Sequence, residues 1–298
     1  MADRLLYAVP TARHPRMGFV LSMRGLELGC KTFERSAQDF AYTVGPVQMA
    51  RSIAVGRAIE EGYDYLVMHD DDMMVSPVGP SGNPLDAWHA LMQQEPEVGM
   101  VGVAYLGEHA ELPLATVVHP DYPASDGQPE EVCHLIAGLR YAPTVVAGVG
   151  TGFVMIRVAA LKALRESEKV TGGGPPFKFQ VRRNRFGAMV EVGEDYDFCQ
   201  RLRATGWKIV IDPRFDTTHL KDTGNLTYNW HDYEARYAGA GLERELERIG
   251  QVAQPGCQAI KIGEFICLDH TQNRRRDGEA ALKAMTDAIA ASKQEKAA

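Results

Sequence analysis

The sequence predicts an α/β fold, because stretches with strand character alternate with stretches of helical periodicity along most of its length. The clearest unit has a strand at Leu5–Val9, an apolar helical stripe over residues 48–61 that ends at Gly62, and a second strand at Tyr65–Met68. With 298 residues, of which 45% are hydrophobic and 24% charged, the chain can form a full core and has the composition of a soluble globular protein.

The first strand ends in Pro10-Thr11, and the polar loop 12–16 follows it. We expect a further strand at Gly18–Met23. Loops that leave the carboxyl ends of strands are where α/β sheets bind their ligands. Residues 12–16 are therefore a candidate binding segment.

Helix signals continue after the β-α-β unit. Asn83 followed by Pro84 is a good N-cap and first-turn pair, and Pro96 closes the helix that they begin. A strand over Val98–Tyr105 follows. Between residues 107 and 141 the periodicity is weak and Pro is frequent, which favours loops and a hairpin.

The second half alternates in the same way. Its predicted elements are two β-prone runs over 145–156, a helix after Val158, a loop over 171–187, a helix over 194–205 and a strand over 207–211. Past Lys221 the chain looks helical and charged. We therefore divide it into an α/β domain at residues 1–221 and a helical C-terminal extension at residues 222–298.

Bulk properties exclude several classes of protein. The formal charge of −7 argues against a protein whose whole surface grips nucleic acid. Five scattered cysteines without CxxC spacing suggest neither a disulfide framework nor a zinc knuckle. No secretory signal or membrane-spanning stretch is visible, so we expect a cytoplasmic protein.

The most informative segment is the apolar strand that runs directly into Asp70-Asp71-Asp72. Carboxylates this close repel one another, so a cation is their natural ligand, and Mg²⁺ or Mn²⁺ prefers such hard oxygen ligands. In an extended backbone Asp70 and Asp72 would point to one side and Asp71 to the other. The alternative is an incidental solvated acidic loop.

A second acidic cluster begins the helix predicted at residue 194. Asp195 lies on the same stripe as Phe198 and Leu202, so its side chain should face the protein body or a cleft floor, where a general base can be held in one orientation. Glu194 would shape that pocket. The structural alternative is stabilisation of the helix dipole by Glu194 and Asp195.

Three further positions are candidate ligand contacts beside these acidic clusters. His219 would complete a metal site if its segment lies beside the acidic strand end, although a lone histidine is more often structural. Arg13 and Arg51 are candidates for phosphate contacts, because a departing diphosphate needs fixed positive charge, but either is also compatible with a solvated arginine.

Two glycine-rich segments need separate treatment. The run Gly148–Gly152 is no dinucleotide fingerprint, because its third glycine comes one place early and a strand follows it; we expect these glycines to let backbone approach a bound sugar or acceptor. The loop 171–187 combines glycine hinges with aromatic and basic residues. It is either a lid over the substrate or a merely mobile loop.

These motifs together resemble the nucleotide-sugar-dependent glycosyltransferases of the A-type fold, specifically glycosyltransferase family 2 and its bacterial and phage relatives. The resemblance spans residues 5–221. Three parts carry it: Val9-Pro10-Thr11, Ala50-Arg51-Ser52 with the Asp-X-Asp run at 70–72, and Gly193-Glu194-Asp195 with His219. It implies a single Rossmann-like domain with a mixed, mostly parallel central sheet flanked by helices.

The resemblance also implies roles for residues. It implies donor contacts at Thr11, Arg13, Arg51, Asp70 and Asp71, metal ligation by Asp72, Asp70 and His219, and a general base at Asp195 with Glu194 beside it. Pro176-Phe177 resembles the proline-aromatic loop that precedes this acid in phage-type relatives. Ser52 departs from the pattern, since relatives often carry Asn there.

The expected activity is metal-dependent transfer of a sugar from a nucleoside-diphosphate sugar, most simply a UDP-sugar, to an acceptor hydroxyl, with inversion and with Mn²⁺ or Mg²⁺ as the cation. A nucleotidyltransferase or a non-catalytic sugar-nucleotide-binding protein on the same scaffold remains an alternative. The acceptor stays open among a glycan, a protein, a small molecule and hydroxymethylated phage DNA. The DNA alternative rests on Arg182, Arg183, Arg185 and the run 274–276.

Overall fold

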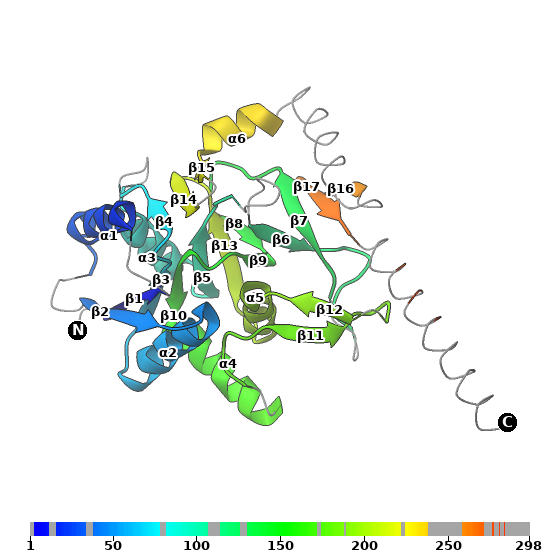
Figure 1. The fold of residues 1–298 in the computed structure, drawn as a ribbon, viewed down its shortest axis with the longest axis horizontal. Coiled ribbons are helices and arrows are strands. Elements are labelled where there is room, and N and C mark those ends of the chain that lie inside the picture. The colour runs from blue at the N-terminus through cyan, green and yellow to red at the C-terminus, as the bar shows by residue number, and fades with distance from the viewer. Residues whose placement is uncertain are drawn as a thin grey trace.

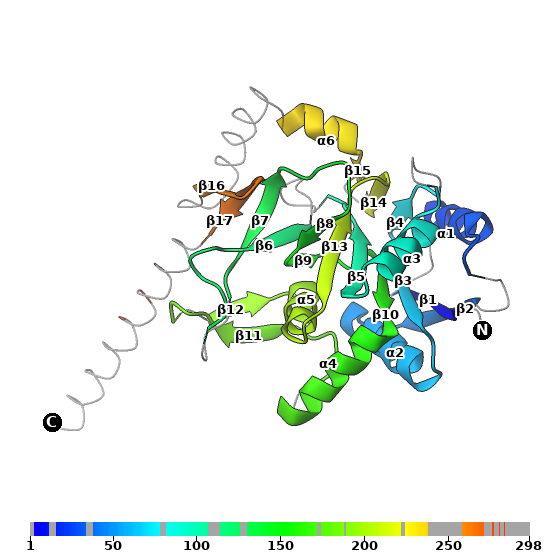
Figure 2. The same ribbon diagram turned by 180° about the vertical axis from the view of Figure 1, so that it is seen from behind.

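A computed structural model describes the chain over residues 3–11, 16–33, 38–77, 82–106, 114–125, 130–171, 174–187, 189–221, 224–237 and 258–270, and at residues 276, 280 and 283. Figure 1 and Figure 2 show the arrangement from opposite sides. A central sheet carries helices on both faces, and smaller sheets lie at its edge. The predicted α/β fold class is confirmed.

The central sheet has seven strands in the order β2-β1-β3-β10-β5-β13-β8. Their bounds are β1 Leu5–Thr11, β2 Gln38–Val44, β3 Tyr65–His69, β5 Val98–Val103, β8 Thr144–Val146, β10 Phe153–Arg157 and β13 Lys208–Asp212. β2, β1, β3, β5 and β13 share one direction, while β10 and β8 run against it. The sheet is therefore mixed and mostly parallel, as expected.

Helices cover both faces because successive residues of the buried strands face opposite sides. Leu6 and Leu66 join one core with α2 (Val47–Glu60), α4 (Val158–Thr171) and α5 (Glu194–Ala204). Tyr7 and Val67 join a second core with α1 (Met17–Gly29) and α3 (Pro84–Gln94). The near-continuous apolar runs of these strands follow from burial on both faces.

Smaller sheets extend this body. Their strands are β4 (Met73–Val75), β6 (Ala115–Val118), β7 (Val132–Ala137), β9 (Gly148–Val149), β11 (Gln180–Arg183), β12 (Met189–Val192), β14 (Thr217–Lys221), β15 (Gly224–Tyr228), β16 (Gln258–Ile262) and β17 (Phe265–Asp269). They form the sheets β15-β14-β4, β16-β17-β7-β6-β9 and β11-β12. A last helix, α6, spans Trp230–Tyr237.

Three element predictions need correction. Residues 18–23, predicted as a strand, belong to α1, because Phe19, Met23 and Leu26 are buried with the spacing of a helix face. The loop predicted at 171–187 contains β11 and takes part in a hairpin. The predicted helical extension contains α6 but also three strands, since β15 pairs with β14 and β17 pairs with β7. The division of the chain at residue 221 stays a prediction.

The predicted cap of α3 is confirmed: Asn83 Oδ1 accepts a hydrogen bond from the Leu85 amide at 2.9 Å. Within the described residues, no helix combines the length and the apolar character needed to cross a bilayer.

Candidate active site

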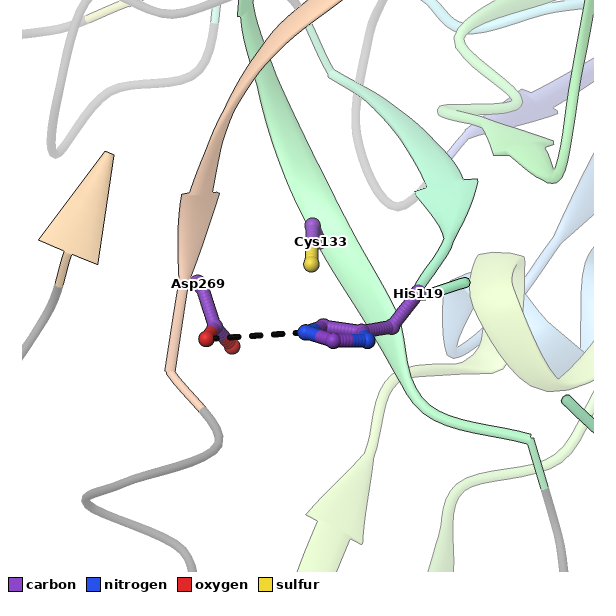
Figure 3. Close-up of side chains that lie close together, drawn as sticks. All are labelled: His119, Cys133 and Asp269. Atoms are coloured by element: carbon purple, nitrogen blue, oxygen red, sulfur yellow. Dashed lines mark ion pairs between the residues drawn. The ribbon is translucent and has the colours of Figure 1, made fainter. Parts of the chain in front are cut away.

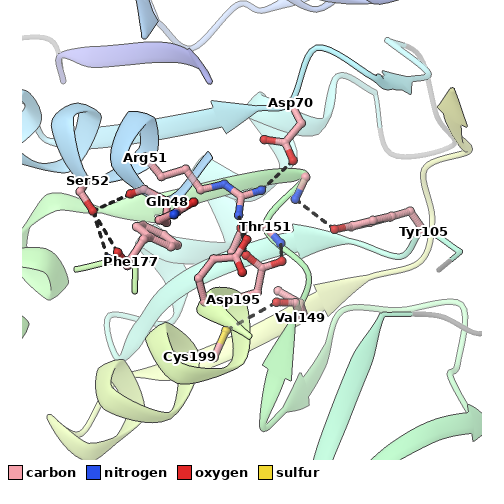
Figure 4. Close-up of polar contacts among 12 residues, drawn as sticks. Gln48, Arg51, Ser52, Asp70, Tyr105, Val149, Thr151, Phe177, Asp195 and Cys199 are labelled. Atoms are coloured by element: carbon pink, nitrogen blue, oxygen red, sulfur yellow. Dashed lines mark hydrogen bonds and ion pairs between the residues drawn. The ribbon is translucent and has the colours of Figure 1, made fainter. Parts of the chain in front are cut away.

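The site is centred on Arg51, which projects from α2 to the edge of the sheet where β1 and β3 end (Figure 4). Its guanidinium donates to Asp70 Oδ2 at 2.6 Å, to Asp195 Oδ1 at 2.7 Å and to Glu194 Oε1 at 3.1 Å. The acids come from two elements far apart in sequence, the end of β3 and the start of α5. One buried arginine therefore joins both predicted acidic clusters.

Burial and the mutual charges of this cluster shift the pKa values of its members. Arg51 is 3% exposed. Burial disfavours its charge, but the charges of Asp195 and Asp70 outweigh that effect and raise its pKa. Burial raises the pKa of Asp70 to about 7, and Asp72 and Asp195 add to the rise. Burial and the charge of Asp195 also raise the pKa of Glu194.

Asp195 is held in one orientation, as we predicted for a general base. Besides Arg51, its carboxylate accepts hydrogen bonds from the Thr151 hydroxyl at 2.5 Å and from the Thr151 amide at 3.1 Å. Its side chain remains 21% exposed. A fixed carboxylate with an accessible edge can accept a proton from a bound hydroxyl group.

The segment between α4 and β11 packs against the arginine. Phe177 stacks on Phe198 at 4.3 Å between ring centroids, and the Arg51 guanidinium carbon lies 5.8 Å from the Phe177 ring centre. The Phe177 amide donates to Ser52 Oγ at 3.2 Å. Arg201 of α5 donates to the Pro176 carbonyl oxygen. The residue at position 52, where the sequence departs from the family pattern, therefore fixes the proline-aromatic loop.

The three acids after β3 do not alternate as an extended strand would. The strand ends at His69, and the Met73 amide donates to the Asp70 carbonyl at 3.1 Å, which makes residues 70–73 a turn. Asp71 accepts a hydrogen bond from Thr11, while Asp70 faces Arg51. Our expectation that Asp70 and Asp72 converge on one side is wrong, because alternation ends where the strand ends.

Asp72 and His219 do lie together. Asp72 Oδ2 is 3.3 Å from His219 Nε2 and 3.1 Å from Lys221 Nζ, both of which reach it from β14. Burial alone would raise the pKa of Asp72, but the hydrogen bonds and charges of His219 and Lys221 lower it to about 2. Sequence analysis did not identify Lys221, which only strand pairing brings to this position.

These donors fit a divalent cation in part. His219 Nδ1 lies 3.2 Å from the Leu106 carbonyl oxygen, so a cation would have to replace the Nε2 proton that points to Asp72. Asp70, the third predicted ligand, is turned toward Arg51, although its Oδ1 is buried and has no hydrogen-bond partner among the described residues. The donor set is thus Asp72 with His219.

Two glycines of the run 148–152 lie against the side chain of Tyr105. A Cβ atom added at Gly150 would lie 2.2 Å from the Tyr105 hydroxyl, and one at Gly152 would lie 3.1 Å from it. The Tyr105 hydroxyl accepts a hydrogen bond from the Gly152 amide at 3.2 Å. These two glycines make room for Tyr105 of this chain, which thereby fixes the segment that carries Thr151.

The remaining predicted residues divide as follows. Thr11 is buried at the end of β1, and Arg13 lies outside the described residues. Arg51 was predicted to contact phosphate, but its partners in the structure are carboxylates. Sequence analysis did not identify Thr151 as a partner of Asp195. The signal that could have identified it is its position between Gly150 and Gly152.

A second buried group, His119, Cys133 and Asp269, also brings possible metal ligands within 4.8 Å of one another (Figure 3). The Asp121 amide donates to His119 Nδ1 at 3.1 Å, so the neutral ring carries its proton on Nε2. Nε2 is the nitrogen that faces Asp269 Oδ2, at 3.6 Å. A protonated nitrogen binds no metal, and the contact instead joins β17 to the end of β6.

No protein-family model matches the chain, and no curated protein matches it. Solved structures show partial similarity. A197 from STIV is 14% identical over 74% of this chain and 86% of its own, with a TM-score of 0.44. GalNAc-T7 with UDP, GalNAc and Mn²⁺ is 10% identical over 73% of this chain and 43% of its own, with a TM-score of 0.42.

UDP-glucose pyrophosphorylase complexed with UDP-glucose is 8% identical over 78% of this chain and 96% of its own, with a TM-score of 0.40. The chain thus spans less than half of GalNAc-T7. At identities and TM-scores this low, the similarities carry no argument about activity. The chemistry of the site has to be argued from its own geometry.

Proposed function

We propose that this chain is a metal-dependent glycosyltransferase, which moves a sugar from a nucleoside-diphosphate sugar, most simply a UDP-sugar, to an acceptor hydroxyl. The observation that carries the proposal is the fixed Asp195 carboxylate, which shares Arg51 with Asp70 at the end of β3. The Asp72–His219 pair follows on the same turn. A base and a cation site at the carboxyl edge of parallel strands are what such a transfer needs.

In the proposed reaction Asp195 accepts the proton of the acceptor hydroxyl as that oxygen bonds to the anomeric carbon and the nucleoside diphosphate leaves. Thr151 and Arg51 hold the carboxylate in place and so limit its loss of entropy in the transition state. Arg51 is a positioning residue in this scheme, because its partners are the acids. Asp195 on the face opposite the leaving group would give inversion.

A cation held by Asp72 and His219, Mn²⁺ or Mg²⁺, would neutralise the charge of the departing diphosphate. Thr11 and Asp71, joined by a hydrogen bond at the end of β1, are proposed to border the nucleotide. We also keep the expectation that the protein acts in the cytoplasm.

The test is to incubate the protein with Mn²⁺ and a panel of nucleotide sugars and to measure which phosphate product forms. We expect the wild type to release a nucleoside diphosphate and the Asp72→Asn variant to release none. The matched control is Asp64→Asn, since the Asp64 carboxylate accepts a hydrogen bond from the Arg4 amide at 2.8 Å and belongs to no acidic cluster of the site.

Two other outcomes would replace the proposal. Pyrophosphate release from a nucleoside triphosphate and a sugar phosphate would identify a nucleotidyltransferase. Tight Mn²⁺ and nucleotide binding without any turnover, in the wild type and in Asp195→Asn alike, would identify a binding protein. The anomeric configuration of the product, followed by NMR, tests inversion separately.

A further inference from the structure

A pocket of about 600 Å³ lies beside α5, away from the Arg51 cluster. Its walls come from α5, from β6 and the start of β7, and from the β11–β12 hairpin, which lie near one another in both views (Figure 1, Figure 2). Two of its lining residues, Gly193 and Tyr196, flank Glu194 and Asp195 in the chain. Neither acid lines the pocket, but a molecule in it lies beside the first turn of α5.

One wall carries an unused polar group. The Tyr196 hydroxyl is buried, and no described residue forms a hydrogen bond with it. Burial raises the pKa of Tyr196, so the group stays a neutral hydroxyl that can both donate and accept. Buried hydroxyls without a partner are rare because desolvation costs free energy, which points to a ligand that supplies the partner.

The charges of the lining disfavour a polyanion. Glu130, Glu131 and Glu191 line the pocket, against Arg182 as the one arginine or lysine of its lining. Arg203 forms a bidentate ion pair with Glu130, at 2.6 and 2.8 Å. A phosphate backbone entering here would meet carboxylates, and nucleic-acid sites show the opposite charge.

Two of the basic residues that suggested DNA, Arg183 and Arg185, have structural partners. Arg183 donates to the Gly187 carbonyl at 2.7 Å within the hairpin. Arg185 donates to the Pro123 carbonyl at 3.0 Å and lies 5.2 Å from the Tyr122 ring centre. Phe186 adds an edge contact to Tyr122 at 5.4 Å. The contacts of Arg185 and Phe186 dock the hairpin on residues 122–123, which follow β6.

The other lining groups are neutral donors, acceptors and apolar surfaces. Gln200 and Thr116 supply amide and hydroxyl groups, and the Tyr196 ring meets His134 edge-on at 5.7 Å. Val132, Val190 and Val192 provide apolar area. A sugar ring presents hydroxyl groups around its rim and carbon-bound hydrogens on its faces, which matches such a mixed wall.

We infer that this pocket binds the acceptor and that the acceptor is a neutral saccharide. The inference rests on the proposed glycosyl transfer for the meaning of acceptor, and it narrows the open choice to the glycan. Tyr196 is a binding residue here. The bound saccharide would extend past Gly193 so that one of its hydroxyls reaches Asp195, which takes the proton.

The first experiment needs no donor. Ligand-observed NMR with a panel of neutral mono- and disaccharides measures binding to the wild type, to Tyr196→Phe and to Tyr63→Phe. We expect one saccharide class to bind, with about fivefold weaker binding in Tyr196→Phe, because one hydrogen bond contributes roughly 1 kcal/mol. Tyr63→Phe is the matched control. The Tyr63 hydroxyl donates a hydrogen bond to the Glu61 carboxylate at 3.1 Å, and both residues lie outside the pocket, in the segment before β3.

Gln200→Ala provides a second variant in case Tyr196→Phe folds poorly, with circular dichroism as the check on folding. Absence of binding by the whole neutral panel, or equal binding by both pocket variants and the wild type, would overturn the inference. So would transfer to hydroxymethylated duplex DNA with a steep salt dependence.

The two proposals fail in different ways. Release of a nucleoside diphosphate together with unchanged saccharide binding in both pocket variants would leave the proposed function standing and refute the pocket assignment. Saccharide binding that depends on Tyr196, without release from any nucleotide sugar, would support the pocket and refute the transferase.

Discussion

The two acidic clusters of this chain end up in different arrangements. Glu194 and Asp195 begin α5 and direct both carboxylates to one guanidinium, that of Arg51. Asp70, Asp71 and Asp72 follow β3 and each has different partners. Asp70 contacts Arg51, Asp71 contacts Thr11, and Asp72 contacts His219 and Lys221. Helix geometry fixes the direction of its first-turn side chains, whereas a turn after a strand imposes no alternation.

This difference separates the two roles we propose. The helix cluster holds one carboxylate rigidly, which suits a base. The turn cluster distributes charge along the sheet edge, which suits contacts to a cation and a nucleotide. Arg51 is the shared element, and Asp70 is the only acid of the turn that reaches it. Variants at these positions test whether the clusters act separately.

The largest expected effect is on catalysis. Asp195→Asn should lower the rate of transfer by about two to four orders of magnitude, because it removes a general base. Glu194→Gln, its neighbour on the same guanidinium, should lower the rate by less than about tenfold if Glu194 only shapes the site. Both rates are measured as nucleoside-diphosphate release with acceptor present. Equal losses would show that the helix cluster acts as one unit.

The second-largest expected effect is on the free energy of unfolding. Arg51→Met leaves three partly buried carboxylates without their cation and should lower the free energy of unfolding by about 3–5 kcal/mol, measured in urea. Arg57→Met is the control on the same helix. Its ion pair with Glu61, at 2.8 Å, is exposed, so about 0.5 kcal/mol or less should be lost. A similarly small loss at Arg51 would contradict the coupling of the clusters.

A third prediction concerns the strand before the turn. Burial lowers the pKa of His69 to about 3; Tyr7 donates to its Nδ1 at 2.6 Å, and its Nε2 faces the Met73 carbonyl at 3.0 Å. The unfolded chain takes up this proton below pH ~6.5, so stability is complete above that value and falls as the pH approaches 3.

At pH ~4.5 the loss attributable to His69 should be about 2–3 kcal/mol relative to pH ~7. His69→Gln keeps a donor toward Met73 but cannot titrate, so its unfolding free energy should depend less steeply on pH over this interval. Urea titrations at several pH values measure the slope. Identical slopes in the two proteins would show that another group causes the acid sensitivity.

The smallest expected effect is on metal affinity. Lys221 shares Asp72 Oδ2 with His219, so Lys221→Met should strengthen Mn²⁺ binding by about twofold to fivefold through loss of a competing partly buried ion pair. Isothermal titration calorimetry measures the dissociation constant. Lys208→Met, which removes the exposed pair with Glu97, is the control. Weaker binding in Lys221→Met would mean that the lysine supports the site.

Several parts of the fold could be predicted because their signals are local. The apolar stripe of α2, the Asn83 cap of α3 and the buried run of β3 each lie within one element. The segment 18–23 misled us because a short apolar run fits either a strand or a helix, and only burial of Phe19, Met23 and Leu26 decides the period. The strands after residue 221 were missed. β15 and β16 form local hairpins with β14 and β17, and β17 also pairs with the distant β7.

The sequence by itself determined that acids stand at the end of β3 and at the start of α5, and it singled out Arg51, Asp195 and His219. Only the tertiary structure decided which of these meet, since Arg51 and Asp195 are 144 positions apart and no local pattern encodes that contact. The tertiary structure also revealed Lys221 beside Asp72 and the pocket around Tyr196. Both depend on how separate sheets and helices pack, and the chain specifies that packing through its whole core.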